Sequence, residues 1–149
     1  MRITVDRREL EGLLKTFRKM PEEVQKRGMD EALLKGARPI EVAAKQNAPI
    51  GGILWERRRP NEKPLRETII ARVSKIKRGN KVRVFSTSKI AGPLEFGHDI
   101  VTKDGRVVGH AGPKPFMRRA FDVKRGISLR LIVDDLGKTI ERLWKRGNR

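Results

Sequence analysis

Residues 94–121 read LEFGHDIVTKDGRVVGHAGPKPFMRRAF, and this stretch determines how the second half of the chain is organised. Leu94–Gly97 is predicted to be the last part of a strand, which ends at the glycine. Pro115 stands where the first turn of a helix tolerates a residue without an N–H. About 17 residues separate the two signals, and loops of that length are usually functional or disordered. We therefore expect an excursion that returns to the domain at the Pro115-Phe116 helix start.

A turn signal lies in the middle of this excursion. Asp104-Gly105 is a typical hairpin dipeptide, and it separates residues 99–103 from residues 106–110. This pattern predicts that the excursion, residues 98–112, is an extended loop or a hairpin arm.

Two helices are predicted at the N-terminal side. The first begins after Asp6, and its apolar face consists of Leu10, Leu13, Leu14 and Phe17. The second ends near Asn47, because Pro49 disfavours helical angles in the residue before it. Pro39 removes a helical hydrogen bond, which predicts a kink or a break near Arg38. The second helix is rich in small residues such as Gly36, so a sheet or a neighbouring subunit could approach it closely.

In the middle of the chain, apolar and polar residues alternate with the period of two that is typical of strands, which predicts a short antiparallel sheet. One strand is expected over residues 66–77, a return strand over 82–86 and a third over 91–96, with Gly79-Asn80 as the turn between the first two. A long helix follows over residues 116–145, with a restart at Gly126 as an alternative. The predicted fold class is α+β: two N-terminal helices, a short antiparallel sheet with an extended loop or hairpin arm, and a long C-terminal helix packed on the sheet. Phe116 is expected to lie in the core beneath that sheet.

Length and composition narrow the class of protein. The 149 residues fit one domain, residues 1–149, with residues 50–64 and 98–112 as excursions for assembly. Cysteine is absent, which excludes disulfides and thiol catalysis. No apolar run is long enough to span a membrane, and no apolar segment of a signal peptide follows Met1. We therefore expect a protein that functions or assembles in a cytosol, without a membrane partner.

The charge is strongly positive. The 36 basic and 18 acidic residues give a net charge of +18, which indicates a polyanionic partner. The surplus is concentrated at residues 51–80, with nine basic and three acidic residues, and at 114–149, with eleven and four. A highly charged surface of the kind found in thermophile proteins is the alternative interpretation.

The sequence offers little for catalysis. His98 and His110, near Asp99 and Asp104, have no spacing typical of metal ligands on one helix face. The serines have no histidine at the spacing of a nucleophilic motif. We expect no enzymatic activity, no metal and no cofactor; a metal nuclease built on His98 is the third hypothesis considered. Glu95 is expected to have an architectural role, such as an ion pair across a subunit boundary.

Basic residues cluster in the loop at 50–64 and at the start of the last helix. Such side chains bind DNA through its phosphates, and a mobile charged loop is the equally weighted alternative. Trp55, His98 and His110 are candidates for interfaces, although Trp55 could instead fold back over the core. The nucleic-acid-facing candidates are Arg57, Arg58, Arg59, Lys63, Arg66, Arg118 and Arg119.

Four passages in this order resemble a known family. They are Ala44–Pro49 (AKQNAP), Leu65–Ile69 (LRETI), Glu95-Phe96-Gly97 and Pro115-Phe116. The order is similar to that of the neck, tail-completion or minor tail-component proteins, which join head to tail in long-tailed double-stranded DNA bacteriophages. The family-motif residues are Asn47, Pro49, Leu65, Arg66, Glu95, Phe96, Gly97, Pro115 and Phe116.

The resemblance implies a structural virion protein of the phage neck or tail, assembled in the host cytoplasm. Copies would form a ring of six, with twelve as the alternative, between head-completion or connector proteins and the tail terminator. The ring would line the DNA passage through non-specific phosphate contacts, and the two excursions would contact neighbouring rings. The alternative from composition is a basic, non-enzymatic nucleic-acid-binding module, such as a ribosome- or nucleoid-associated protein.

Overall fold

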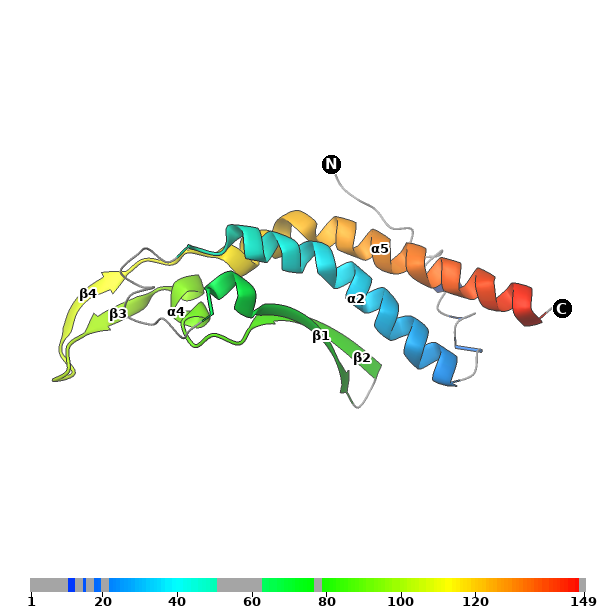
Figure 1. The fold of residues 1–149 in the computed structure, drawn as a ribbon, viewed down its shortest axis with the longest axis horizontal. Coiled ribbons are helices and arrows are strands. Elements are labelled where there is room, and N and C mark those ends of the chain that lie inside the picture. The colour runs from blue at the N-terminus through cyan, green and yellow to red at the C-terminus, as the bar shows by residue number, and fades with distance from the viewer. Residues whose placement is uncertain are drawn as a thin grey trace. The chain divides into compact units, whose positions relative to one another are not determined.

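The computed structural model of the chain describes residues 11–12, 15, 18–19, 22–50, 63–76 and 79–147 (Figure 1). In chain order its elements are helix α2 (Glu22–Asn47), the 3-10 helix η1 (Leu65–Thr68), strands β1 (Ile69–Ile76) and β2 (Gly79–Ser86), helix α4 (Ala91–Phe96), strands β3 (His98–Val101) and β4 (Val107–Ala111), and helix α5 (Phe116–Gly147). The protein is therefore α+β and ends in a long helix, as predicted. The second predicted N-terminal helix is α2, and most of the first lies outside the described residues.

The strands form two separate two-stranded sheets, β1 with β2 and β3 with β4 (Figure 1). The predicted third strand at residues 91–96 is wrong, because this segment is helix α4. Pro93 falls in the first turn of α4, where the missing N–H costs no hydrogen bond. Gly97 ends the helix at φ 80°, a conformation that favours glycine. Leu94–Gly97 is thus a helix end and not a strand end.

The first hairpin begins later than the sequence predicts. Residues 65–68 form η1, in which the Glu67 N–H donates to the Pro64 carbonyl at 2.9 Å, and only then does β1 begin. The predicted turn residues Gly79 and Asn80 belong to strand β2, so that assignment is wrong. The two residues between the strands, 77 and 78, lie outside the described residues.

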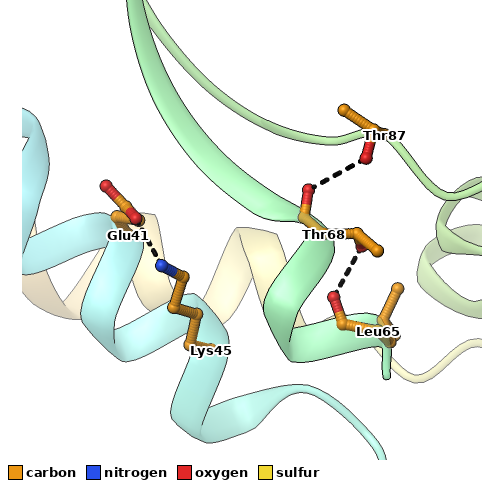
Figure 2. A network of polar contacts seen from close by, with 5 residues as sticks. All are labelled: Glu41, Lys45, Leu65, Thr68 and Thr87. Carbon is orange, nitrogen blue, oxygen red and sulfur yellow. Dashed lines mark hydrogen bonds and ion pairs between the residues drawn. The ribbon is translucent and has the colours of Figure 1, made fainter. Parts of the chain in front are cut away.

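Thr68 joins the start of β1 to the end of β2. Its hydroxyl donates to the Leu65 carbonyl at 2.6 Å and lies 2.7 Å from the Ser86 hydroxyl. Its carbonyl accepts the Thr87 N–H at 3.0 Å and lies 3.4 Å from the Thr87 hydroxyl (Figure 2). The hydroxyl of Thr68 therefore links the start of β1 to the end of β2.

Helix α2 runs through Pro39 without interruption, so the predicted break is absent. The buried Ala37 and Ala43 lie on either side of the proline, and tertiary packing of such residues offsets the loss of one hydrogen bond. Helix α5 likewise continues through Gly126 without a restart.

The chain divides into two compact units, and α2, α5, β1 and β2 contribute residues to both. The first unit is formed by the described residues within 1–39, 71–83 and 124–149. In its core, Ala32 of α2 packs with Leu136 of α5. A Cβ on Gly36 would collide with the Ile132 side chain, so the glycine permits this close approach of α5. The small residues of α2 thus allow the close approach of a helix of the same chain, and not of the sheet or neighbouring subunit that the sequence suggested.

Two polar contacts accompany that packing in the first unit. The Ser128 hydroxyl donates to the Gly36 carbonyl, and Lys35 pairs with the nearly buried Asp135. Both contacts link α2 to α5, so the buried polar groups at this crossing have partners.

Among the described residues, the second unit, residues 40–70 and 84–123, contains a larger cluster of buried apolar residues than the first. Alanines from the end of α2 pack there with residues from η1, β1 and α5. Phe116, the first residue of α5, is the largest side chain in this core and is 2% exposed. Its predicted burial is therefore confirmed. The buried members are Ala43, Ala44, Ala48, Leu65, Ile69, Phe116 and Ala120.

Replacing Phe116 by Ala should lower the free energy of unfolding by about 3–5 kcal/mol, because a cavity replaces a buried ring. Urea denaturation followed by circular dichroism measures this change. Phe121→Ala on the same helix is the matched control, because Phe121 is 52% exposed and should cost less than about 1 kcal/mol. Equal effects of the two substitutions would contradict the assignment of Phe116 to the core.

Candidate functional site: the root of the arm

The arm, residues 98–112, is part of the second unit and lies between helix α4 and helix α5 in the chain. We call residues 94–97 and 111–118 the root of the arm, because the two chain segments meet there. The predicted hairpin is confirmed: β3 and β4 pair in antiparallel fashion, and Gly105 occupies a turn position at φ 81°. The root determines how the arm is presented.

Glu95 caps helix α5 from helix α4. Its Oε2 accepts the Met117 N–H and its Oε1 accepts the Arg118 N–H, both at 2.9 Å. These N–H groups belong to the first turn of α5, which has no helical partner for them. A carboxylate also favours the positive end of the helix dipole, and hydrogen bonds to an ionised acceptor are stronger than neutral ones. Because Glu95 is only 8% exposed, little water competes with this cap.

Two backbone features close the root beside Glu95. The Lys114 N–H donates to the Leu94 carbonyl at 2.7 Å. A Cβ on Gly97 would lie 2.8 Å from the carbonyl oxygen of Ala111, so the outgoing and returning segments touch at this glycine. Any larger residue at position 97 would meet both this contact and the strain of its positive φ. Glu95 and Gly97 thus both help to hold the outgoing and returning segments of the arm together at the root.

The arrangement at the root suits packing and not acid–base chemistry. Both carboxylate oxygens of Glu95 accept hydrogen bonds from backbone N–H groups of the same chain, whereas the sequence suggested an ion pair across a subunit boundary as its architectural role. The helix N-terminus, often an anion site, already holds this carboxylate. Phosphate contacts near the root therefore depend on exposed side chains.

The two histidines do not converge. The hairpin register pairs His98 with Ala111 and Asp99 with His110, which places the histidines on opposite faces of the arm. His110 Nδ1 lies 2.9 Å from Asp99 Oδ1, and His98 Nδ1 lies 3.4 Å from the Pro93 carbonyl oxygen. In the part of the chain that the structure describes, no group of three His, Cys, Asp or Glu residues could hold a metal ion. This geometry disfavours the nuclease hypothesis.

The family-motif residues have two different environments. Leu65 and Phe116 are buried in the core of the second unit, and Pro49 and Pro115 are partly buried. Asn47 ends α2 and is exposed, as is Arg66. Phe96, at the end of α4, is 70% exposed, so this aromatic residue of the motif is not a core residue. The four passages otherwise meet in one core and its helix cap.

The basic candidates are dispersed along the described chain. Lys63 precedes η1 and Arg66 belongs to it, and both are exposed. Arg118 and Arg119 are exposed in the first turn of α5. Arg57, Arg58, Arg59 and Trp55 lie outside the described residues.

Sequence reasoning missed an apolar set on the arm. Ile100, Val101, Val107 and Val108 are 48–60% exposed, although such side chains are usually buried. The signal was available, because these aliphatic residues flank the Asp104-Gly105 turn.

The comparisons with known proteins agree with the resemblance seen in the sequence. Residues 11–97 match the model of the HK97-gp10-like family, described as "Bacteriophage HK97-gp10, putative tail-component". The matched region ends at Gly97 and so includes the Glu95-Phe96-Gly97 passage. Neither the curated proteins nor the solved structures gave a match. Among the helices in the described ranges, none combines the length and apolarity needed to cross a bilayer.

Glu95→Ala should lower the free energy of unfolding by about 2–4 kcal/mol, because two hydrogen bonds to a charged acceptor are lost. Amide hydrogen exchange at Met117 and Arg118 should become faster at the same time, which reports the cap itself. Glu95→Gln keeps one acceptor oxygen and should have a smaller effect on both measurements.

The control for this experiment is Glu67→Ala, because Glu67 is exposed and its backbone N–H, which donates to the Pro64 carbonyl, is kept in the variant. Its effect should stay within about 0.5 kcal/mol. Unchanged exchange at Met117 and Arg118 in Glu95→Ala would show that the carboxylate is not the cap.

Proposed function

The chain belongs to the HK97-gp10-like family of bacteriophage tail components, and on this premise we propose that it is a non-enzymatic building block of the phage neck. Family membership supports a structural role in the virion. In the proposal, copies form a ring of six, or of twelve, between the head-completion or connector proteins and the tail terminator. The ring joins the tail to the head and surrounds the path of the DNA.

One observation carries this proposal. The four passages that resemble the family, three of them within the matched residues 11–97, contribute residues to a buried core and a helix cap in the second unit, and not to a cluster of reactive side chains. Motif residues of an enzyme would instead place acids, bases or nucleophiles around a substrate. Motif residues whose role is to pack and cap the fold favour a structural protein, which acts by presenting surfaces to its neighbours.

The charge supports contact with DNA inside the ring. A net charge of +18 per chain would attract the phosphate backbone, and contacts to phosphates carry no sequence information. Exposed basic residues of the described chain can make such contacts with a passing duplex. They include Lys63, Arg66, Arg118 and Arg119.

The same charge also supports the second candidate, a basic nucleic-acid-binding module. That module would bind RNA or DNA as a monomer and would not require phage neighbours. Family membership favours the neck component, and the two candidates differ in where the protein is found.

Localisation in purified particles tests the proposed function. Antibody labelling viewed by electron microscopy should place the protein at the head–tail junction, and particles lacking it should contain filled heads without attached tails. Light scattering of the purified protein should give the mass of a multimer. A monomer that is absent from particles and binds RNA tightly would replace the neck proposal with the nucleic-acid-binding module.

Replacing Arg118 and Arg119 by Gln should weaken duplex DNA binding and reduce its salt dependence. Each phosphate contact contributes about 0.9 to the slope of log K against log salt, so the slope should fall by about 2. Fluorescence anisotropy between 50 and 200 mM salt, roughly the range over which such contacts weaken strongly, measures it. Glu95 binds the backbone of Arg118 and not its side chain, so the cap should remain.

The matched control replaces Lys103 and Arg106 by Gln, which removes the same charge from the arm. This variant should keep the slope of the unmodified protein. A slope that falls equally in both variants would show that total charge, and not the start of α5, determines DNA binding.

A further inference from the structure

The arm exposes more apolar surface than a free hairpin should. No residue of 98–112 is buried, and its four large aliphatic side chains are about half exposed. An isolated two-stranded hairpin is marginally stable in water, because it lacks a layer to cover its apolar side chains. Contiguous exposed apolar residues on a soluble protein usually mark an interaction site.

Both faces of the arm contribute to this surface. The register pairs Ile100 with Gly109, and Ile100 Cδ1 lies 3.6 Å from where a Gly109 Cβ would be, so both belong to one face. The ladder shifts between Ile100 and Val101, where Val101 pairs with Val107 and leaves Val108 as the extra residue. Because adjacent residues of a strand point to opposite faces, Ile100 and Val101 expose apolar groups on both sides. A partner must therefore surround the end of the arm.

The turn of the arm is held by its own hydrogen bonds. The Thr102 N–H donates to the Arg106 carbonyl at 2.9 Å, and the Arg106 N–H donates to the Thr102 hydroxyl at 3.2 Å. The Gly105 N–H also donates to the Thr102 carbonyl at 3.0 Å. An end that is shaped before binding loses less conformational entropy when a partner covers it.

The charge of the arm identifies the partner. Residues 98–112 contain two basic residues, Lys103 and Arg106, and two acidic residues, Asp99 and Asp104, so their net charge is zero. The whole surplus of +18 is carried by the rest of the chain. DNA would gain nothing from contact with a neutral apolar segment. Two strongly basic copies of the chain repel each other, and this repulsion is weakest where they meet through a surface without net charge.

We propose that the arm is the surface by which one copy of this chain binds a second copy. The side chains of Ile100, Val101, Val107 and Val108 pack against that second copy. The inference rests on the proposed ring, and it names the contact that builds that ring. An arm that meets a different surface of the next copy is a head-to-tail contact, which closes into a ring when the rotation permits.

The first test replaces Val101 and Val108 by Ser in the full-length chain. Sedimentation velocity over a concentration series should show assembly weakened at least tenfold relative to the unmodified protein. The control, Lys103→Ser with Asp104→Ser, changes two exposed residues of the same arm without changing its net charge and should assemble within about twofold of the unmodified protein. Equal assembly of all three proteins would overturn the proposal.

A second test does not depend on the stability of the hairpin. Because the chain contains no cysteine, Val108→Cys introduces one unique thiol. Labelled with a maleimide photo-crosslinker, it should give cross-linked pairs of this chain, and mass spectrometry should place the arm of one copy on another. Cross-links confined to the arm's own chain in an assembled sample would overturn the proposal.

These outcomes are separable from those of the proposed function. If particles contain the protein at the neck but the arm cross-links to a different virion protein, the neck role stands and the second copy is rejected as the partner. If copies cross-link through the arm but particles lack the protein, the contact stands and the neck role fails.

Discussion

Two hydrogen bonds from the first turn of α5 to the carboxylate of Glu95 hold together the part of the fold from which the arm extends. Helix α5 begins at the residue that fills the core, so its first turn must lie close to α4 while its N–H groups still need acceptors. A nearly buried carboxylate meets both needs, because it satisfies two donors and opposes the positive end of the helix dipole. Without an acceptor there, the burial of Phe116 would leave polar groups unsatisfied beside an apolar core.

The closure at the root has a consequence for the arm. The Leu94 carbonyl, Gly97 and Ala111 bring the outgoing and returning segments together, and Glu95 attaches the returning segment to its helix. The arm therefore starts and ends at one place and can project as a paired hairpin. A closed root and a hydrogen-bonded turn reduce the conformational freedom of a segment that has no core of its own.

Burial and charge are divided between different parts of the molecule. The passages that resemble the family contribute Ala44, Ala48, Leu65, Ile69 and Phe116 to one core, while Asn47, Arg66 and Phe96 of the same passages are exposed. Most basic residues that the structure describes are exposed, although Lys45 and Lys124 are partly buried, and the arm has no net charge and exposes apolar side chains. Such a division suits a structural component that presents surfaces of different character to its neighbours. Phe96 belongs to the second group, because most of its ring is exposed although its neighbour Glu95 is buried.

The sequence by itself determined the long C-terminal helix, the turn at Asp104-Gly105, the burial of Phe116 and the strong positive charge. Each of these follows from local signals: apolar periodicity, a hairpin dipeptide, a proline before an aromatic residue, and composition. Only the tertiary structure decided that residues 91–96 form a helix, because six residues are too few for periodicity to distinguish a helix from a strand. It also decided the role of Glu95, whose partners lie 22 and 23 residues later in the chain. Nothing local indicates which backbone groups a carboxylate will meet, since that depends on where the arm returns.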